Sequence, residues 1–357
     1  MLHAIKQMVP LTAKEKIRAK RKNLSKTIMR LFSKSQKLSA LYYLIFNNNF
    51  NKEMQSVLKG NIKFDDYSKS PKSSSPQLRR NIHRLEKGLS MPERRNIFGE
   101  AFIIETVKLY IAATKTEAFS KSELEWAFDV LETFFSQVGS SEVIDFAREL
   151  YVKNKICLES DLTRVPYKKE KVLKSDISYD DLLVLAKQRS SVRWYLDKEV
   201  PDELLNKAIA LATTAPSACN RQPFEFLVIN DKNKAKEVVS CPAGTAGFSN
   251  QVPCTIVVVG NLSCYPTPAD RHVIYIDAAL ASMQLMLALE TLGLSSCPIN
   301  WPENTIRENL LKNHVNLPDY KRVIMMISVG YGDEKSFIPF SSKKTVNELR
   351  TSIESYS

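Results

Sequence analysis

The sequence predicts an α+β fold preceded by a mainly helical N-terminal region. Three runs rich in Val, Ile and Phe are bounded by turn residues, as strands are: Phe224–Ile229, Thr255–Val259 and Val323–Val329. A long apolar segment from about Val273 to Leu292 lies between the last two runs. A helix that is apolar on several faces is buried, and we expect this one at a subunit interface.

The first half of the chain contains only helical patterns. Ile17, Leu24, Ile28 and Leu31 have helical spacing within 11–40. Further helices are predicted over 99–117, 121–137 and 141–154, the second with a capping box of Ser122 and Glu125. Residues 69–76 are rich in Ser and Pro and predict a loop. Residues 151–175 are charged and aperiodic, so we expect a domain boundary there.

This pattern divides the chain into three predicted parts. Residues 1–80 form a basic arm that is partly helical and flexible, 81–175 a helical region, and 176–357 the α+β domain. The last part begins with a helix over about 178–188. A second helix runs from Pro201 to about Thr213, with proline in its first turn.

The positive charge is concentrated at the N-terminus. The first 80 residues hold 18 Lys and Arg against four acidic residues, a net +14, which leaves −2 for the rest because the total is +12. Such an arm can touch an anionic surface or polymer, or it can be a solvated helical arm. No base-reading motif accompanies it, so specific nucleic-acid recognition is not expected.

The cysteines and histidines predict neither disulfides nor a metal site. The six cysteines form no C-x-x-C pair, and a chain of 357 residues needs no disulfide staples, so free thiols in a reducing cytoplasm are expected. The four histidines have no metal-ligand spacing. The N-terminus lacks a signal-peptide pattern, and its longest apolar run, 38–46, is too short to span a bilayer.

Two segments about thirty residues apart carry the chemistry. The first contains Arg189, Ser190, Ser191 and Arg193 at a predicted helix end. Arginine donates two hydrogen bonds to a phosphate, and residues four apart can reach one group if the helical turn continues. By itself this pattern also fits a basic helix end that satisfies its own carbonyls.

The second segment is a polar turn that runs into a strand. Small residues and Pro216 allow close approach of the backbone to a ligand, and Ser217 adds a hydroxyl. Asn220 and Gln222 offer donors and acceptors to the edge of a flat polar ring. An ordinary turn is the other interpretation. Cys219 has no positioned base beside it in the sequence, so we interpret it as a small packed residue.

Together the two segments resemble the FMN-binding core of the nitroreductase superfamily. Further matches occur in the order that this family has them. Asn250 precedes the second strand, the segment Pro298, Ile299, Asn300 and Trp301 follows the long helix, and the basic pair Lys343 and Lys344 follows the last strand. The resemblance covers about residues 176–350.

The resemblance implies a sandwich of a mostly antiparallel sheet flanked by helices, and a homodimer with FMN at its interface. Arg189, Ser190, Ser191, Arg193 and Lys343 or Lys344 would hold the phosphate. Pro216, Ser217, Asn220, Gln222, Asn250, Pro298 and Ile299 would contact the cofactor. Backbone amides near Asn300 and Trp301 would face flavin N5 and O4, with no catalytic side chain. NADH or NADPH would be the reductant in ping-pong turnover with an organic acceptor.

Two points limit what the resemblance implies. After Asn250 the chain enters the strand directly, where the family often has a loop with another cation, so the substrate site can be open. The same fold also supports dehalogenation and ring dehydrogenation, and a non-enzymatic scaffold with a basic docking arm stays an alternative. The stretch His83–Leu89 resembles extensions of nitroreductase-like proteins encoded among surface-polysaccharide genes, although its mixed charges also fit an internal ion-pair network.

Overall fold

The computed structural model describes residues 11–156 and 160–353, which divide into two units that meet between Gln55 and Ser56. In the first unit, α2 (Leu11–Phe32) and α3 (Gln36–Ile45) precede the start of α4 (Asn51–Lys69). The single helix expected over 11–40 is therefore wrong. The Ser35 side chain accepts a hydrogen bond from the Leu38 amide and starts a new helix there.

The second unit begins with a helical subdomain. It contains α5 (Pro76–Leu89), α6 (Ile103–Thr114), α7 (Lys121–Gln137) and α8 (Glu142–Asn154), around a core that includes Leu78, Ile82, Leu85, Tyr110 and Phe134. The three predicted helices and the 69–76 loop are confirmed. The capping box is wrong, because Ser120 and not Ser122 caps α7, accepting from the Glu123 amide.

The sheet of the α+β domain has four antiparallel strands. They are β1 (Phe224–Ile229), β2 (Cys254–Asn261), β3 (Ser295–Asn300) and β4 (Lys321–Gly330), in the order β1-β2-β4-β3. The three predicted strands are confirmed. The strand β3 was not predicted, because Ser, Cys and Pro give it little strand propensity and only pairing with β4 extends it.

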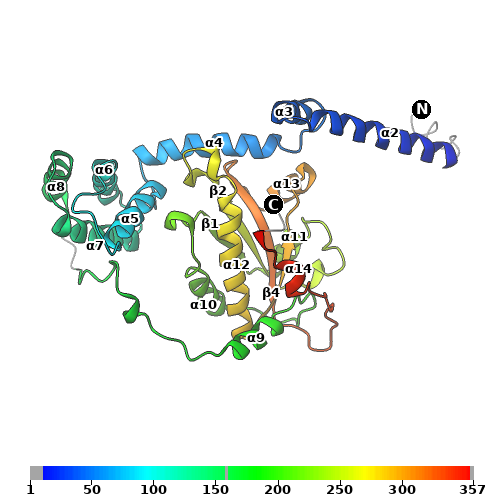
Figure 1. The fold of residues 1–357 in the computed structure, drawn as a ribbon. Helices are drawn as coiled ribbons and strands as arrows, with labels where there is room; N and C mark the ends of the chain where they lie inside the picture. Colours follow the sequence, from blue (N-terminus) through cyan, green and yellow to red (C-terminus); the bar gives the residue numbers. More distant parts are fainter. Residues whose placement is uncertain (1–10, 157–159, 354–357) are drawn as a thin grey trace. The chain divides into compact units, whose positions relative to one another are not determined.

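Helices cover both faces of this sheet (Figure 1). Ile256 and Val258 of β2 join a core formed with α10 (Asp202–Ala212) and α12 (Val273–Thr291). Val257 and Val259 point the other way, toward a core with α11 (Lys232–Val239) and α13 (Thr305–Lys312). Alternate residues of one strand thus enter two cores, which confirms the predicted α+β sandwich.

The long helix α12 is buried on one side only. Ile274, Ala278, Ala281 and Leu285 are fully buried against the sheet, whereas Ile276, Leu280 and Met283 are exposed. Its length and composition would suit a membrane span, but more than half of the apolar 18-residue stretch within Pro268–Thr291 is buried inside the fold. We therefore interpret α12 as a core helix with a free apolar stripe.

Two helices, α4 and α5, contact loops that flank the strands of the sheet. In α4, Asn61 donates to the Tyr265 carbonyl at 2.9 Å, and a Cβ at Gly60 would lie 2.7 Å from Leu262 Cβ, so glycine permits this approach. In α5, Arg79 contacts the turn that precedes β1. The other α-helices in the described residues are α9 (Tyr179–Gln188) and α14 (Val346–Leu349), the latter in an exposed C-terminal segment.

Candidate functional site

The segment around Arg189 leaves helical geometry where the sequence places its helix end. Helix α9 ends at Gln188, and Arg189 has extended backbone angles, so the helical turn that was to align Arg189 with Arg193 does not continue. The chain instead forms a parallel bridge between Ser191 and Ser296, with the Val192 amide donating to the Ser296 carbonyl at 3.1 Å. The backbone of this segment therefore hydrogen-bonds to β3 instead of forming another helical turn.

The two arginines nevertheless converge on β3. Burial raises the pKa of the Cys297 thiol, while Arg193, a hydrogen bond from Ser191 and Arg189 act in the opposite direction. Both guanidinium groups and the Ser191 hydroxyl thus act on one residue of this strand, and Arg189 also acts electrostatically on the Glu290 carboxyl group of α12. The Nε atom of Arg189 is buried and has no hydrogen-bond partner among the described residues. An unpaired buried donor of a charged group is costly, which suits a site for an anion.

Gln251 holds this segment in place from the side of β2. Its side chain accepts from the Tyr195 amide at 2.7 Å and donates to the Arg193 carbonyl. The Tyr195 hydroxyl lies 2.8 Å from the Ser328 hydroxyl of β4. Sequence reasoning did not single out Gln251. Asn250 beside it is exposed.

The polar turn is organised by a carboxylate of α12. Asp277, 2% exposed, accepts from the Ser217 hydroxyl at 2.7 Å and from the Ala218 amide at 3.0 Å. The Ser217 hydroxyl in turn accepts from the Gln222 amide at 2.8 Å, and the Gln222 side chain donates to the Asn220 side chain at 2.9 Å. Pro216 is exposed at its start.

This turn, Ser217–Gln222, is strained. Cys219, Asn220 and Gln222 have φ angles of 53°, 51° and 50°, in the left-handed region that favours glycine. Such conformations persist only where the surroundings over-determine them, and they cluster at ligand sites. The hydrogen bonds to Asp277 and Ser217 are the restraint here. Sequence reasoning placed Asp277 at the start of the long helix but assigned it no role, because one polar residue in an apolar helix does not indicate its partner.

The helical subdomain also touches the turn. Arg79 Nε of α5 donates to the Asn220 carbonyl at 2.9 Å, and Arg79 Nη1 lies 3.1 Å from a carboxylate oxygen of the buried Glu123. Glu123 also accepts from the Ser74 hydroxyl and the Ser75 amide, at 2.6 and 3.0 Å. The extension thus fixes the backbone of a predicted site residue.

The structure does not bring the two predicted segments together within one chain. Gln188 contacts Glu290 at 3.4 Å, and Ser217 contacts Asp277, so the segments meet α12 thirteen residues apart. At 1.5 Å per residue these contacts are separated by about 20 Å along the helix axis. Of the remaining predicted residues, Ile299 and Trp301 are buried, Pro298 is half-buried and Asn300 is exposed. Lys343 and Lys344 are exposed in the C-terminal segment.

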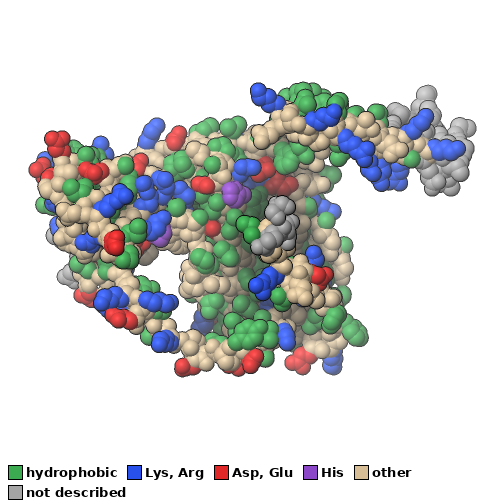
Figure 2. Space-filling model, in the orientation of Figure 1, with side chains coloured by type: hydrophobic (Ala, Val, Ile, Leu, Met, Phe, Trp, Pro, Cys, Tyr) green, Lys and Arg blue, Asp and Glu red, His purple; other side chains and the backbone are tan. Residues whose placement is uncertain are grey.

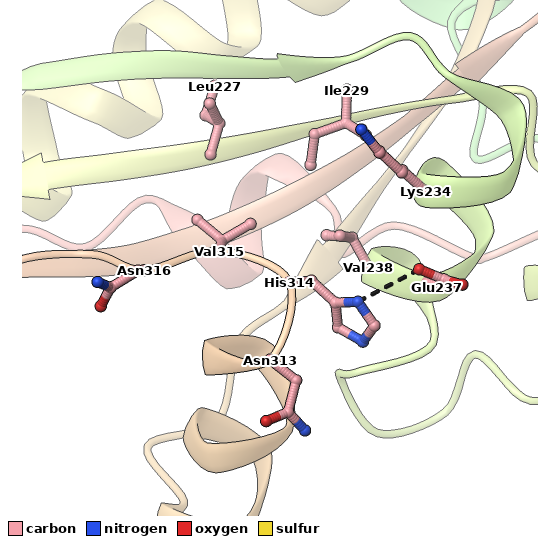
Figure 3. A pocket seen from close by; sticks show the side chains of 9 residues that line it. All are labelled: Leu227, Ile229, Lys234, Glu237, Val238, Asn313, His314, Val315 and Asn316. Carbon is pink, nitrogen blue, oxygen red and sulfur yellow. Dashed lines mark ion pairs between the residues drawn. The ribbon is translucent and has the colours of Figure 1, made fainter.

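A pocket elsewhere contains none of the predicted residues. It has a volume of about 510 Å³ and lies between β1, α11 and the loop after α13, where His314 Nδ1 is 3.3 Å from a Glu237 carboxylate oxygen (Figure 3). In the described part of the chain, no group of three or more His, Cys, Asp or Glu residues is placed to hold a metal ion. The five described cysteines are unpaired, and Cys157 lies outside the described residues.

An antiparallel sheet covered by helices on both faces defines the class of this domain as α+β. The sequence profile of the nitroreductase family matches residues 186–240 and 233–331. Residues 186–331 are therefore a domain of the nitroreductase superfamily, and the part of the chain that precedes it is mainly helical.

Individual relatives match the same half of the chain. A provisionally named NADH dehydrogenase/NAD(P)H nitroreductase of Archaeoglobus fulgidus is 29% identical over 162 residues, which are 44% of this chain and 90% of the relative. The iodotyrosine deiodinase of Thermotoga neapolitana is 29% identical over 174 residues, 42% and 88% of the two chains. The solved structure of an FMN-dependent nitroreductase of Clostridium difficile covers 47% of this chain and 98% of its own, with 27% identity and a TM-score of 0.42.

Proposed function

We propose that this chain is an FMN-dependent oxidoreductase that uses NADH or NADPH to reduce an organic acceptor. The family match and the names of relatives such as the NADH dehydrogenase/NAD(P)H nitroreductase support this activity. A cytoplasmic location and a link to surface-polysaccharide biosynthesis stay predictions.

The observation that carries the proposal is the unpartnered Nε of the half-buried Arg189 beside Arg193 and Ser191. A flavin phosphate, with a charge of about −1.5 to −2, would satisfy that donor and bind both guanidinium groups. The residues present therefore fit the phosphate end of FMN. Lys343 and Lys344 are the further cations that would bind it.

The turn Ser217–Gln222 fits the ring end of the cofactor. Bound FMN would supply the redox chemistry, taking a hydride equivalent from NAD(P)H and reducing the acceptor in ping-pong turnover. Asn220, Gln222 and Asn250 would orient the ring, and the amides near Asn300 and Trp301 would donate to its N5 and O4 edge. Ser217, held by Asp277, would keep the turn in its strained form.

We infer that the site is shared between two copies of the chain. The phosphate segment and the turn contact α12 about 20 Å apart, so a second copy is needed to place a turn near Arg189. The exposed stripe of Ile276, Leu280 and Met283 on α12 offers the apolar surface for such a dimer. The basic arm would add weak attraction to an anionic surface.

The cofactor itself provides the first test. Flavin released by heat from the purified protein should be FMN by chromatography. Arg189→Ala should weaken FMN binding by about 2–4 kcal/mol, the cost of truncating one partner of a buried charge pair. Arg95→Ala removes the same charge from an exposed position and should leave FMN affinity unchanged. FAD, or no flavin after reconstitution, would refute the proposal.

Reductive dehalogenation is a second candidate reaction. It is favoured by the match to iodotyrosine deiodinases, including the one from Thermotoga neapolitana. The flavin-loaded protein, reduced with dithionite, would release iodide from iodotyrosine if this were its activity. Flavin reoxidation by quinones and nitroaromatics without iodide release would favour the first candidate.

A further inference from the structure

One face of α5 is buried and the other carries cations. Leu78, Ile82 and Leu85 enter the core of the helical subdomain. The other face holds Arg80, Arg84 and Lys87, spaced four and three residues apart as neighbours on a helix are. We call these three residues the α5 basic stripe. Figure 2 shows Lys and Arg side chains gathered over this helix.

The carboxylates around the α5 basic stripe are engaged by other donors. Glu123 accepts from Arg79, Ser74 and Ser75, as described above. Glu86 accepts from Trp126 Nε1 at 2.9 Å and lies 3.2 Å from His83 Nδ1. Glu105 accepts from the side chains of Gln77 and Asn81, both at 2.9 Å. The predicted ion-pair network therefore exists, and within it only Glu105 acts on the stripe, through a longer-range attraction to Arg84.

As a result, the α5 basic stripe has no ion-pair partner in the described parts of the chain. Arg84 is held in place by stacking, with its guanidinium carbon 3.6 Å from the centroid of the Phe102 ring. Arg80 and Arg84 are half-buried, unlike Lys115 and Lys121 of the same subdomain, which are exposed. Burial and the neighbouring charge of Arg80 lower the pKa of Arg84. Glu105 offsets only part of this effect, because the pKa of Arg84 stays lowered. An anion bound beside Arg80 and Arg84 would relieve the remaining repulsion.

The α5 basic stripe borders the strained turn. Arg79, one residue before Arg80, donates to the Asn220 carbonyl, and α5 packs against Ala218–Asn220 of the same turn. Under the proposed function this turn contacts the flavin ring. A molecule that stacks on that ring would therefore lie within reach of these cations.

From this juxtaposition we propose that the α5 basic stripe binds the anionic group, a carboxylate or phosphate, of a small acceptor reduced at the flavin. This inference rests on the proposed function and gives the N-terminal extension a role in substrate selection. Arginine is suited to it because its planar fork matches both groups. The chemistry at the flavin is unchanged, and the stripe contributes orientation and affinity for the charged end of the acceptor.

The test compares acceptors that differ only in charge. Turnover of the full-length, flavin-loaded protein is measured with 4-nitrobenzoate and the neutral 4-nitrobenzamide, and with 4-nitrobenzyl phosphate and 4-nitrobenzyl alcohol. The wild type should prefer the anionic member of at least one pair by about tenfold or more in kcat/KM. The pair with the larger preference tells whether carboxylate or phosphate is bound.

Two variants carrying equal charge changes separate a local site from general attraction. In Arg80→Gln/Arg84→Gln/Lys87→Gln the preference should fall at least fivefold, through a higher KM for the anionic acceptor. In Lys115→Gln/Lys121→Gln/Lys153→Gln, which removes the same charge from exposed positions of the same subdomain, it should persist. A preference that is absent from the wild type, unchanged in the first variant, or lost equally in both would overturn the proposal.

Calorimetric titration with 4-nitrobenzoate and 4-nitrobenzamide gives a readout that does not need turnover. Tighter binding of the anion that disappears in the stripe variant supports the site even if no acceptor is reduced, in which case the proposed function alone fails. Equal binding of both compounds to the wild type would refute the stripe whatever the enzyme does. Circular dichroism should show that both variants keep the wild-type helix content.

Discussion

Glu123 anchors Arg79, which connects the helical subdomain to the turn Ser217–Gln222. Removing Glu123 should therefore weaken the contact between the N-terminal extension and the predicted flavin site. The Glu123 side chain is 2% exposed and accepts hydrogen bonds from the Ser74 hydroxyl, the Ser75 amide and Arg79. In Glu123→Ala, Arg79 loses its counterion and the Ser75 amide is left buried without a partner. The Asn220 carbonyl then depends on an arginine that is no longer fixed.

The expected loss of stability follows from these contacts. Breaking a buried ion pair from one side costs about 3–5 kcal/mol, and an unsatisfied buried amide about 1–3 kcal/mol, but the terms are not additive. Because the Arg79 side chain is 16% exposed, water can solvate part of it. We therefore expect a total of about 3 kcal/mol, which corresponds to a fall in Tm of roughly 4–6 °C for a compact unit that spans Ser56–Ser357.

Calorimetry and urea unfolding of the full-length protein measure this loss of stability. The amount of flavin that the purified variant retains shows whether the turn Ser217–Gln222 keeps its conformation. Glu149→Ala, at an exposed position of α8, is the matched control and should change Tm by less than 2 °C, as surface substitutions do. Glu123→Gln keeps one acceptor oxygen and should give an intermediate loss. If Glu123→Ala melts like Glu149→Ala and keeps its flavin, the link from α7 through α5 to the turn is wrong.

Three further predictions test packing, alkaline stability and assembly. Gly88→Ala places a Cβ 2.2 Å from the Phe98 ring and should cost about 1–3 kcal/mol in urea unfolding, whereas Gly247→Ala, with no atom within 4 Å of its Cβ, should cost under 1. Burial raises the pKa of Cys254 to about 12 from the ordinary 9.0, so its contribution to stability is complete below pH 9 and is lost as the pH rises toward 12. Cys254→Ala should therefore flatten the decline of the unfolding free energy between pH 9 and 11 by up to about 1.4 kcal/mol per pH unit, and an unaltered slope would contradict this. Leu280→Asp, in the exposed stripe of α12, should convert a sedimenting dimer into a monomer with less bound flavin, while a flavin-loaded monomer of the wild type would exclude the shared site.

Local patterns predicted the elements whose burial is regular. Both cores of the sandwich take alternate residues of β2, so a continuous Val and Ile run was sufficient to predict that strand. The helix α7 was predicted with its observed bounds because its apolar spacing is helical throughout. The strand β3 and the break between α2 and α3 were missed, since pairing with β4 and one serine cap decide them.

By itself the sequence determined the class of fold, the family resemblance and the residue types suited to a phosphate and a polar ring. It could not determine which groups meet. Only the tertiary structure showed that Arg189 and Arg193 converge through β3 rather than a helical turn, that Asp277 holds the turn Ser217–Gln222, and that the two segments contact α12 about 20 Å apart. The position of α5 beside that turn could not be predicted from the sequence either. Contacts of this kind join residues up to 141 positions apart in the chain, as Arg79 and Asn220 are, and local sequence patterns carry no information about such pairs.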